Sequence, residues 1–260
     1  MMQDIMVGEI GQNNIGQGDI AFQQKLYDDP NATRRNLHRA RKAWIERRLD
    51  AALTSPQKVL EVGVGCGTFT RYLSEKNATV HAVDINQQFL DGVAGLPGVE
   101  VLNADATKDL GLRDIDIAVC SEVLEHVPPR DSQSMLQQFA SSLKPGGMLI
   151  LTTPQRYSSV EMMVRLFRFP FILAIAKKLY GTAEDLGHIN LLTNNELRKQ
   201  IAQAGFIVAE QDFFGFYLPF IAEFGGETGS RFQQSLGRAL KHIPVLKNLL
   251  WTQAFILVKP

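Results

Sequence analysis

A glycine-rich loop with a carboxylate ahead of it is the first feature of this sequence that could do chemistry. Glu61, Gly63, Gly65 and Gly67 fall at every second position, and apolar residues precede and follow Glu61. Glycine tolerates positive φ, and without a Cβ it lets a ligand approach the backbone closely. A helix that starts just after the loop would offer unpaired N–H groups. The carboxylate would repel a pyrophosphate and suits a cationic ligand, while a turn that serves only packing is the competing interpretation.

Two further acids come at the ends of predicted strands. Asp84 ends the predicted strand 79–84, and Asp105 follows the predicted strand 99–103. A carboxylate at the carboxyl end of a strand, beside a glycine loop, can accept hydrogen bonds from both hydroxyls of a ribose. We therefore predict that Asp84 binds a ribose. The alternatives are a helix N-cap for Asp84, a role that Asn86 could fill instead, and a turn for Asp105.

Two histidines are candidates for acid–base chemistry. His126 follows the predicted central strand 115–119, in the sequence Glu122-Val123-Leu124-Glu125-His126. Ligands of open α/β sheets lie at the carboxyl ends of the strands, and imidazole titrates near neutral pH. His126 is our first candidate for a general base, although it could instead line the pocket or order the loop. His188 is the second, with a structural role as an equal alternative.

Taken together, the acid-led glycine loop, the two strand-end acids and Glu125-His126 resemble class I S-adenosylmethionine methyltransferases. The resemblance covers roughly residues 55 to 155 and is strongest to small-molecule enzymes, including those of ubiquinone biosynthesis. It implies S-adenosylmethionine as cofactor and S-adenosylhomocysteine as product. It also implies that Asp105 accepts a hydrogen bond from the adenine amine. The cofactor-binding residues that it implies are Glu61, Gly63, Gly65, Gly67, Asp84, Ile85, Asp105, Ala106 and Ser121.

The hydrophobic periodicity of the rest of the chain predicts the helices and strands that must position these residues. Helices are predicted at 68–76, 129–143 and 194–204, and strands at 148–152, 206–213 and 251–258. Alternation of strands and helices predicts an α/β fold. The resemblance implies a Rossmann-like, seven-stranded, mostly parallel sheet with an antiparallel last strand and helices on both faces. Thr193 and Glu196 have the spacing of a capping box.

The N-terminal part is predicted to cover the cofactor. Residues 1–20 are expected to form a flexible tail, and 21–260 a single methyltransferase domain. A helix at 31–53 carries seven basic residues against two acids, Glu46 and Asp50. This basic face is either solvated, a lid for the cofactor, or a patch for anionic lipid or nucleic acid. By analogy with related enzymes, Tyr27 and Arg34 (or Arg35) are candidates for the residues that cover the bound cofactor.

Two insertions, 155–190 and 217–249, are predicted to form a cap over the substrate. The first holds many Met and Phe residues between 160 and 180, and Pro170 should break it into two helices. The interpretations are a helical pair packed on the sheet, an apolar lid over a lipophilic acceptor, and a helix at a membrane surface.

Composition limits the cellular compartment and the kinds of ligand that we expect. The 260 residues carry a formal net charge of zero and two cysteines without the spacing of a metal site. We see neither a secretory leader nor an apolar run of about 18 to 20 residues, the length of a membrane span. We therefore expect a cytoplasmic protein without a metal and without clear affinity for nucleic acid.

The resulting hypothesis is a methyltransferase that acts on a small, apolar acceptor, with O-methylation favoured. The alternatives are a peripheral-membrane quinone or lipid methyltransferase, a non-catalytic cofactor-binding assembly factor, and an RNA methyltransferase.

Overall fold

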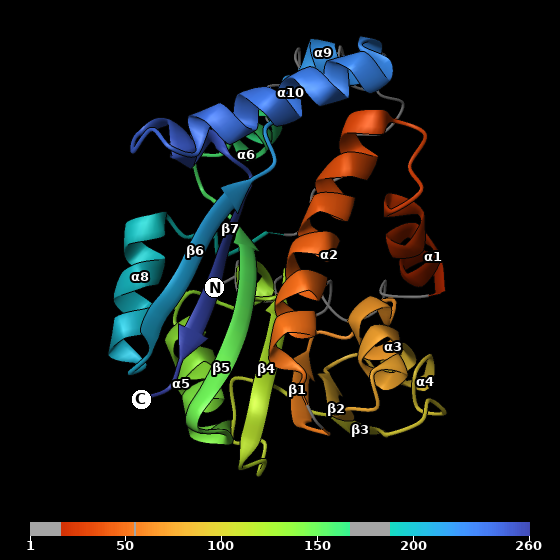
Figure 1. The fold of residues 1–260 in the computed structure, drawn as a ribbon, viewed down its shortest axis with the longest axis vertical. Coiled ribbons are helices and arrows are strands. Elements are labelled where there is room, and N and C mark those ends of the chain that lie inside the picture. Colours follow the sequence, from red (N-terminus) through yellow and green to blue (C-terminus); the bar gives the residue numbers. More distant parts are fainter. Residues whose placement is uncertain (1–16, 55, 167–187) are drawn as a thin grey trace, which may run out of the picture.

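Seven strands form one sheet in the order β3-β2-β1-β4-β5-β7-β6 (Figure 1). The computed structural model describes residues 17–54, 56–166 and 188–260. All pairs from β3 to β5 are parallel, whereas β7 is antiparallel to both β5 and β6. The predicted fold class is confirmed. The strands are β1 (Lys58–Val62), β2 (Thr79–Asp84), β3 (Val99–Asn103), β4 (Ile115–Ser121), β5 (Leu143–Pro154), β6 (Ile207–Phe214) and β7 (Thr252–Val258).

Helices cover both faces of this sheet. Figure 1 shows α2 and α3 in front of the sheet and α5 behind it. The described helices are α1 (Gln17–Leu26), α2 (Ala32–Ala52), α3 (Thr68–Glu75), α4 (Gln87–Asp91), α5 (Ser132–Ser142), α6 (Ser159–Leu166), α8 (Asn194–Gln203), α9 (Pro219–Phe224) and α10 (Gly226–Leu240), with 3-10 turns η1 (Leu124–His126) and η2 (Leu246–Leu249).

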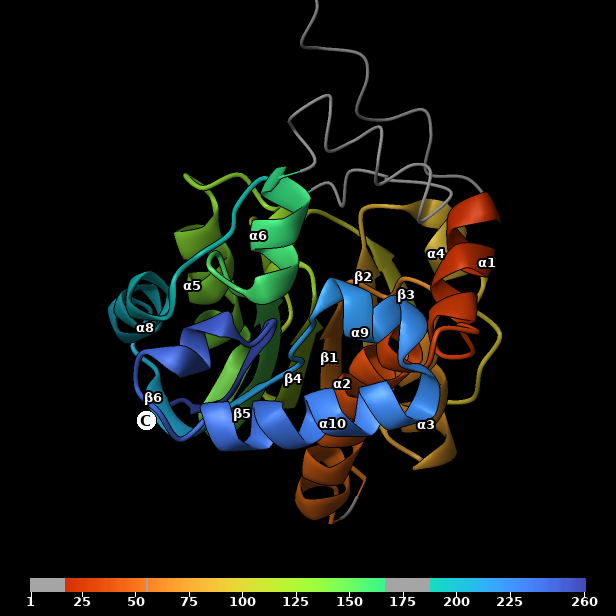
Figure 2. The same cartoon turned by 90° about the horizontal axis from the view of Figure 1, so that it is seen from above.

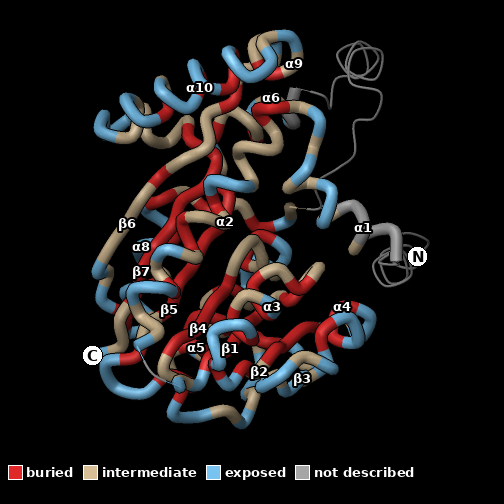
Figure 3. Tube along the Cα trace, turned by 45° about the vertical axis from the view of Figure 1, so that its right-hand side comes forward, coloured by how far each residue is buried: buried red, intermediate tan, exposed pale blue. Residues whose placement is uncertain are grey.

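Each layer of helices packs against one face of the sheet and forms an apolar core with it. On one face, Trp44, Ile45 and Leu49 of α2 pack with residues of α3 and α4 against the sheet. On the other face, residues of α5 and α8 pack around Leu60, Leu149 and other strand residues. The central strands β1, β4 and β5 are therefore mostly buried on both sides, as Figure 3 shows by the buried colour along β4 and β5, whereas β3 and β6 at the edges are more exposed. Burial on both faces explains why these strands read as apolar runs rather than as alternating patterns.

Most predicted boundaries agree with the structure to within a few residues. Asn86, not Asp84, caps α4, and Thr193 with Glu196 forms the predicted capping box. Two expectations need correction. The helix predicted at 129–143 begins only at Ser132, and residues 144–147 extend β5, because Leu143 pairs with Ile115 across a register shift.

Some predictions lie partly or wholly outside the described residues. Helix α1 begins at Gln17, inside the predicted tail, and residues 1–16 are outside the described ranges. So are 167–187, which include the predicted break at Pro170. No helix in the described ranges is long and apolar enough to span a membrane.

The topology places the segments that follow the parallel strands at one edge of the sheet. Because β1 to β6 run parallel, the segments that follow β1, β2, β3, β4, β5 and β6 all start at the carboxyl edge. Viewed from above, α6 and α9, which follow β5 and β6, lie near one another on this side (Figure 2). The hydroxyl of Ser159 at the start of α6 accepts a hydrogen bond from the amide of Tyr217, just ahead of α9.

Candidate active site

The glycine loop between β1 and α3 has the backbone that its sequence requires. Gly63, Gly65 and Gly67 have φ angles of 83°, 51° and 77°, which L side chains rarely adopt. Gln23 of α1 also reaches this loop, because its Oε1 accepts a hydrogen bond from the amide of Cys66 at 2.9 Å. A Cβ added at Gly65 would lie 2.5 Å from the same oxygen. Sequence reasoning did not predict this contact, since Gln23 follows a segment without clear periodicity.

Glu61 lies under the loop as a buried carboxylate. Its Oε2 accepts a hydrogen bond of 2.6 Å from the hydroxyl of Thr70 in α3. Its Oε1 is buried and has no hydrogen-bond partner among the described residues. Burial, and secondarily the charge of Asp84, raises the pKa of Glu61 to about 8. An unpartnered buried carboxylate oxygen is costly, and a cationic ligand at the loop would reduce that cost.

Asp84 and Asp105 lie at the ends of adjacent strands, beside the glycine loop. Asp84 accepts hydrogen bonds from the amides of Gly65 (3.4 Å) and Asn86 (2.9 Å). It is 9% exposed, and burial raises its pKa. Register pairs Asp84 with Asn103, two residues before Asp105. The structure thus brings both acids to one side of the loop.

The residues next to these acids differ in exposure. Ile85 is 72% exposed, an unusual value for a large apolar side chain beside a buried acid, whereas Ala106 is buried. Asp105 is exposed, and its Oδ1 accepts hydrogen bonds from both the amide (2.9 Å) and the hydroxyl (2.7 Å) of Thr107. The turn-forming role considered for Asp105 is therefore present, and it leaves Oδ2 for a ligand.

The residues predicted to cover the cofactor have other partners. Arg34 forms ion pairs of 3.0 Å with Asp29 and with Glu223 of α9. This arrangement gives no support to a contact between Arg34 and the cofactor. Tyr27 interacts with Arg41, a residue of α2 that sequence reasoning recorded only as part of the basic face. Arg41 is buried and lies 3.1 Å from Glu122, at the end of β4.

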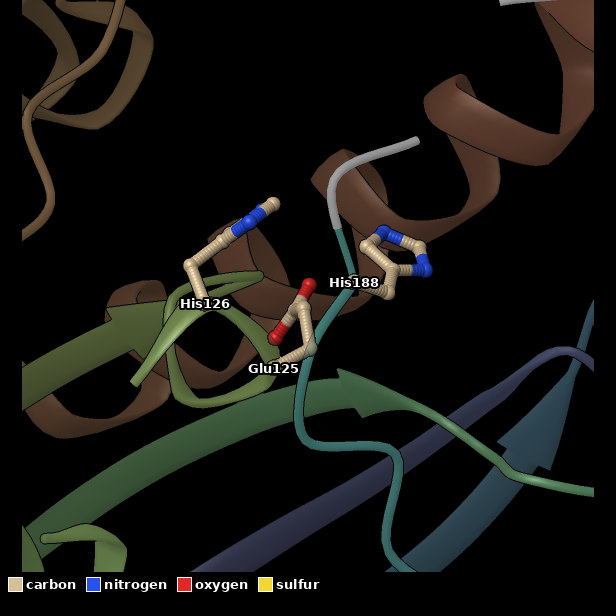
Figure 4. A group of neighbouring side chains, drawn as sticks. All are labelled: Glu125, His126 and His188. Atoms are coloured by element: carbon tan, nitrogen blue, oxygen red, sulfur yellow. The ribbon is translucent and has the colours of Figure 1, made fainter. Parts of the chain in front are cut away.

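Glu125, His126 and His188 form one cluster at the carboxyl edge. Their ligand atoms lie within 4.8 Å of one another, and the two imidazole centroids are 5.4 Å apart. In Figure 4 the Glu125 carboxylate lies between the two rings. The segment that carries His188 is held there by its backbone, because the amides of Ile189 and Asn190 donate to the carbonyl of Glu125 at 3.0 and 2.9 Å. Both histidines singled out in the sequence are therefore neighbours.

The surroundings of the cluster fix two of its side chains. The Nδ1 atom of His188 lies 2.9 Å from Oε1 of Glu161, a buried residue of α6. The hydroxyl of Thr153 donates to Oε2 of Glu125 at 2.9 Å. Glu125 is fully buried, and burial together with the charge of Glu122 raises its pKa well above the ordinary value. Ser121, one of the implied cofactor residues, contacts the Thr152 hydroxyl at 3.0 Å.

The cluster adjoins the glycine loop. A Cβ added at Gly63 would lie 2.1 Å from Cγ2 of Val123, so the loop packs directly on the segment that carries Glu125. Sheet order, the acid-led glycine loop and the acids at β2 and β3 together define a class I S-adenosylmethionine-dependent methyltransferase. The comparison with known proteins agrees: the chain belongs to a family described as a methyltransferase domain, which matches residues 33–211.

Relatives and solved structures give the same class. The chain is 31% identical over 159 residues to a ubiquinone biosynthesis O-methyltransferase of Idiomarina loihiensis, covering 56% of this chain and 63% of that protein. A similar enzyme of Paraburkholderia phymatum is 33% identical over 139 residues, which are 49% of this chain and 57% of that protein. The chain therefore spans less than two thirds of either relative.

Among solved structures, magnesium protoporphyrin IX methyltransferase from Synechocystis with bound S-adenosylhomocysteine superposes with a TM-score of 0.59 at 16% identity, covering 94% of this chain and 95% of that one. This likeness supports the fold. The family match places the chain among methyltransferase domains.

Proposed function

We propose that this enzyme methylates a hydroxyl group of a small, largely apolar acceptor that binds against Glu125, His126 and His188. The observation that carries the proposal is the position of this cluster at the carboxyl edge, with Val123 joining it to Gly63 of the glycine loop. Catalysis of methyl transfer depends largely on orientation, which can contribute about 7–11 kcal/mol in favourable cases. The cluster is well placed to orient an acceptor.

The cofactor residues fit the chemistry of S-adenosylmethionine. When bound, this cofactor supplies an electrophilic methyl group on a positively charged sulfonium. The unpartnered oxygen of Glu61 and the backbone of the glycine loop suit its cationic amino acid part. Asp84 would hold the ribose hydroxyls, and the exposed Ile85 would lie against the adenine. Asp105 and Ala106 would meet the polar edge of the base.

Hydroxyl acceptors fit the cluster because an alcohol or phenol must lose its proton on methylation. A positioned base contributes typically about 10²–10⁴-fold to such a step. His126 is exposed and is our first candidate for this base. His188 is held by Glu161 and is better suited to orient the acceptor oxygen.

The apolar nature of the acceptor is supported by exposed side chains from the segments that follow β5 and β6 and from the segment just ahead of α8. They are Tyr157, Met162, Ile189, Phe220 and Phe224, each at least 47% exposed. Large apolar side chains gathered on one side of a protein commonly mark a binding surface. A lipophilic acceptor would cover part of them.

Methyl transfer to matched acceptors tests the proposal. Purified enzyme and methyl-labelled S-adenosylmethionine would be incubated with lipophilic phenols, with the anilines of the same carbon skeleton, and with phenols that carry added charged groups. We expect labelled ether from the apolar phenols alone. Equal turnover of the charged phenols would contradict the apolar acceptor, and preferential labelling of the anilines would contradict O-methylation.

A second candidate is a quinone or lipid precursor methylated at a bilayer surface. It is favoured by the relatives named ubiquinone biosynthesis O-methyltransferases and by Phe220 and Phe224 of α9, which are 73% and 72% exposed. Sedimentation with anionic vesicles tests it, comparing the wild type with Phe220→Ser/Phe224→Ser. Co-sedimentation lost in the variant supports this candidate, and an absence of wild-type binding contradicts it.

A further inference from the structure

A cavity outside the candidate active site lies between α2, α10 and the end of β6. Helix α10 packs on α2, and between them the structure leaves a space of about 160 Å³. Its walls come from one face of α2 between Thr33 and Ala40, from residues 212–216, and from one face of α10 between Ser230 and Lys241. None of the described lining residues belongs to the glycine loop or to the cluster at the carboxyl edge. The cavity is therefore a separate site in the fold.

The strand side of the cavity is aromatic. Phe213, Phe214 and Phe216 line it there, and Leu37 lines it on the side of α2. An apolar cavity of about 150 Å³ accommodates a benzene ring, and aromatic side chains pair favourably with another ring in stacked or edge-to-face arrangements. Size and composition together fit an occupant with one aromatic ring.

The buried polar side chains of the wall already have partners. The amide of Asn36 donates to the hydroxyl of Ser230 at 2.8 Å. The side-chain nitrogen of Gln233 donates to the hydroxyl of Thr33 at 3.0 Å, and its oxygen accepts a hydrogen bond from the amide of Leu218. Buried polar groups that are satisfied in this way do not require a polar ligand. The inner part of an occupant can therefore be apolar.

The opening of the cavity is positively charged. Arg238 is exposed and Lys241 is half-buried, so both lie where the cavity meets solvent. Nζ of Lys241 contacts the Asp212 carboxylate at 3.0 Å. Within the described ranges Arg238 forms no ion pair and donates only to the hydroxyl of Ser235, at 2.9 Å. A guanidinium has five N–H donors in a planar fork that matches a carboxylate, so most of the donors of Arg238 can serve a ligand.

We propose that this cavity binds a small aromatic monocarboxylate. The ring lies against the three phenylalanines, and the carboxylate lies at the opening between Arg238 and Lys241. The two cations and the single acid Asp212 leave one net positive charge, which a monoanion balances. The proposal does not depend on the proposed function, because the described lining residues include none of the residues assigned to the cofactor or to the acceptor.

Binding of benzoate to the wild-type protein is the direct test, because benzoate has one ring and one negative charge. Calorimetric titration should show one site with a Kd below about 1 mM, and saturating S-adenosylhomocysteine should leave this Kd unchanged. Benzamide, which has the same ring without the charge, should bind at least about tenfold more weakly. Arg238→Gln should weaken benzoate binding to a similar extent. The matched control is Arg231→Gln, an exposed arginine of α10 that does not line the cavity, and it should bind like the wild type.

The cavity itself is tested by Ala40→Phe. Ala40 is exposed and lines the opening, so a phenyl group there should block entry and raise the Kd for benzoate at least about tenfold without disturbing the core. Ala51→Phe, at another exposed position of α2, is the matched control. S-adenosylhomocysteine binding shows whether each variant is folded, and Arg238→Gln, an exposed substitution, provides an independent test if Ala40→Phe is not.

Four results would overturn the proposal. They are the absence of sub-millimolar binding of benzoate to the wild type, equal affinity for benzamide, displacement of benzoate by S-adenosylhomocysteine, and wild-type affinity for benzoate in either Arg238→Gln or a folded Ala40→Phe protein.

Discussion

The amide of Gly65 donates a hydrogen bond of 3.4 Å to Oδ2 of Asp84, which joins the glycine loop after β1 to the acid at the end of β2. The same carboxylate accepts a bond from Asn86 through its other oxygen. Asp84 therefore shapes the glycine loop, and we propose that it also binds the cofactor. Five predictions follow from this arrangement and from its surroundings.

The glycine loop can be tested with two alanine substitutions. Gly65 and Gly111 both have positive φ, at 51° and 69°, but a Cβ at Gly111 would meet nothing within 4 Å. A left-handed L residue costs about 1–2 kcal/mol, so Gly111→Ala should lower the free energy of unfolding by that amount, and Gly65→Ala by more, because its Cβ would also displace the Gln23 side chain. Only Gly65→Ala should also weaken binding of S-adenosylhomocysteine, measured by calorimetry. Equal affinity in both variants would mean that the ligand does not approach the loop backbone.

The raised pKa of Glu61 predicts a pH dependence of stability. In the folded protein Glu61 holds a proton up to about pH 8, whereas its ordinary value is 4.5. Between these values the unfolded state binds fewer protons, so the free energy of unfolding should fall as pH rises. Glu61→Gln removes this contribution. Urea unfolding at pH 5 and pH 8 should therefore show a smaller fall in the free energy of unfolding for the variant than for the wild type. An identical fall in both proteins would show that Glu61 is ionised throughout.

The ion pair between Arg41 and Glu122 should contribute strongly to stability. Their side chains are 10% and 16% exposed, and the distance is 3.1 Å. Removing one partner of a buried pair costs about 3–5 kcal/mol, so Arg41→Met should destabilise the protein by that order. Arg41→Met/Glu122→Gln should recover part of the loss. The control is Arg39→Met, whose pair with Asp28 is exposed and should be worth less than about 1 kcal/mol.

His126→Ala should lower kcat about 10²–10⁴-fold and leave the affinity for S-adenosylhomocysteine unchanged. The reason is that His126 is our first candidate for the base that takes the proton of the acceptor hydroxyl. His242→Ala is the matched control, and full activity of His126→Ala would remove this residue from the chemistry.

The sequence predicted the sheet because its strands are apolar runs bounded by glycine and acidic residues, and the glycine spacing marked the loop. It could not show that Glu161 supports His188, because these residues come from separate segments that are joined only through packing. The role of Arg41 was hidden among seven basic residues of one helix. Gln23 had no signal, because nothing around it indicated that α1 would reach the loop. Long-range contacts of polar side chains depend on tertiary structure, whereas strands and caps are encoded locally.

The cofactor assignment rests most directly on Asp84. Calorimetric titration of S-adenosylhomocysteine into Asp84→Ala should give a Kd at least about tenfold above that of the wild type, equivalent to about 1.4 kcal/mol. Asp91→Ala, an exposed acid at the end of α4, should bind like the wild type. A folded Asp84→Ala protein with wild-type affinity would contradict the placement of the cofactor at this edge of the sheet.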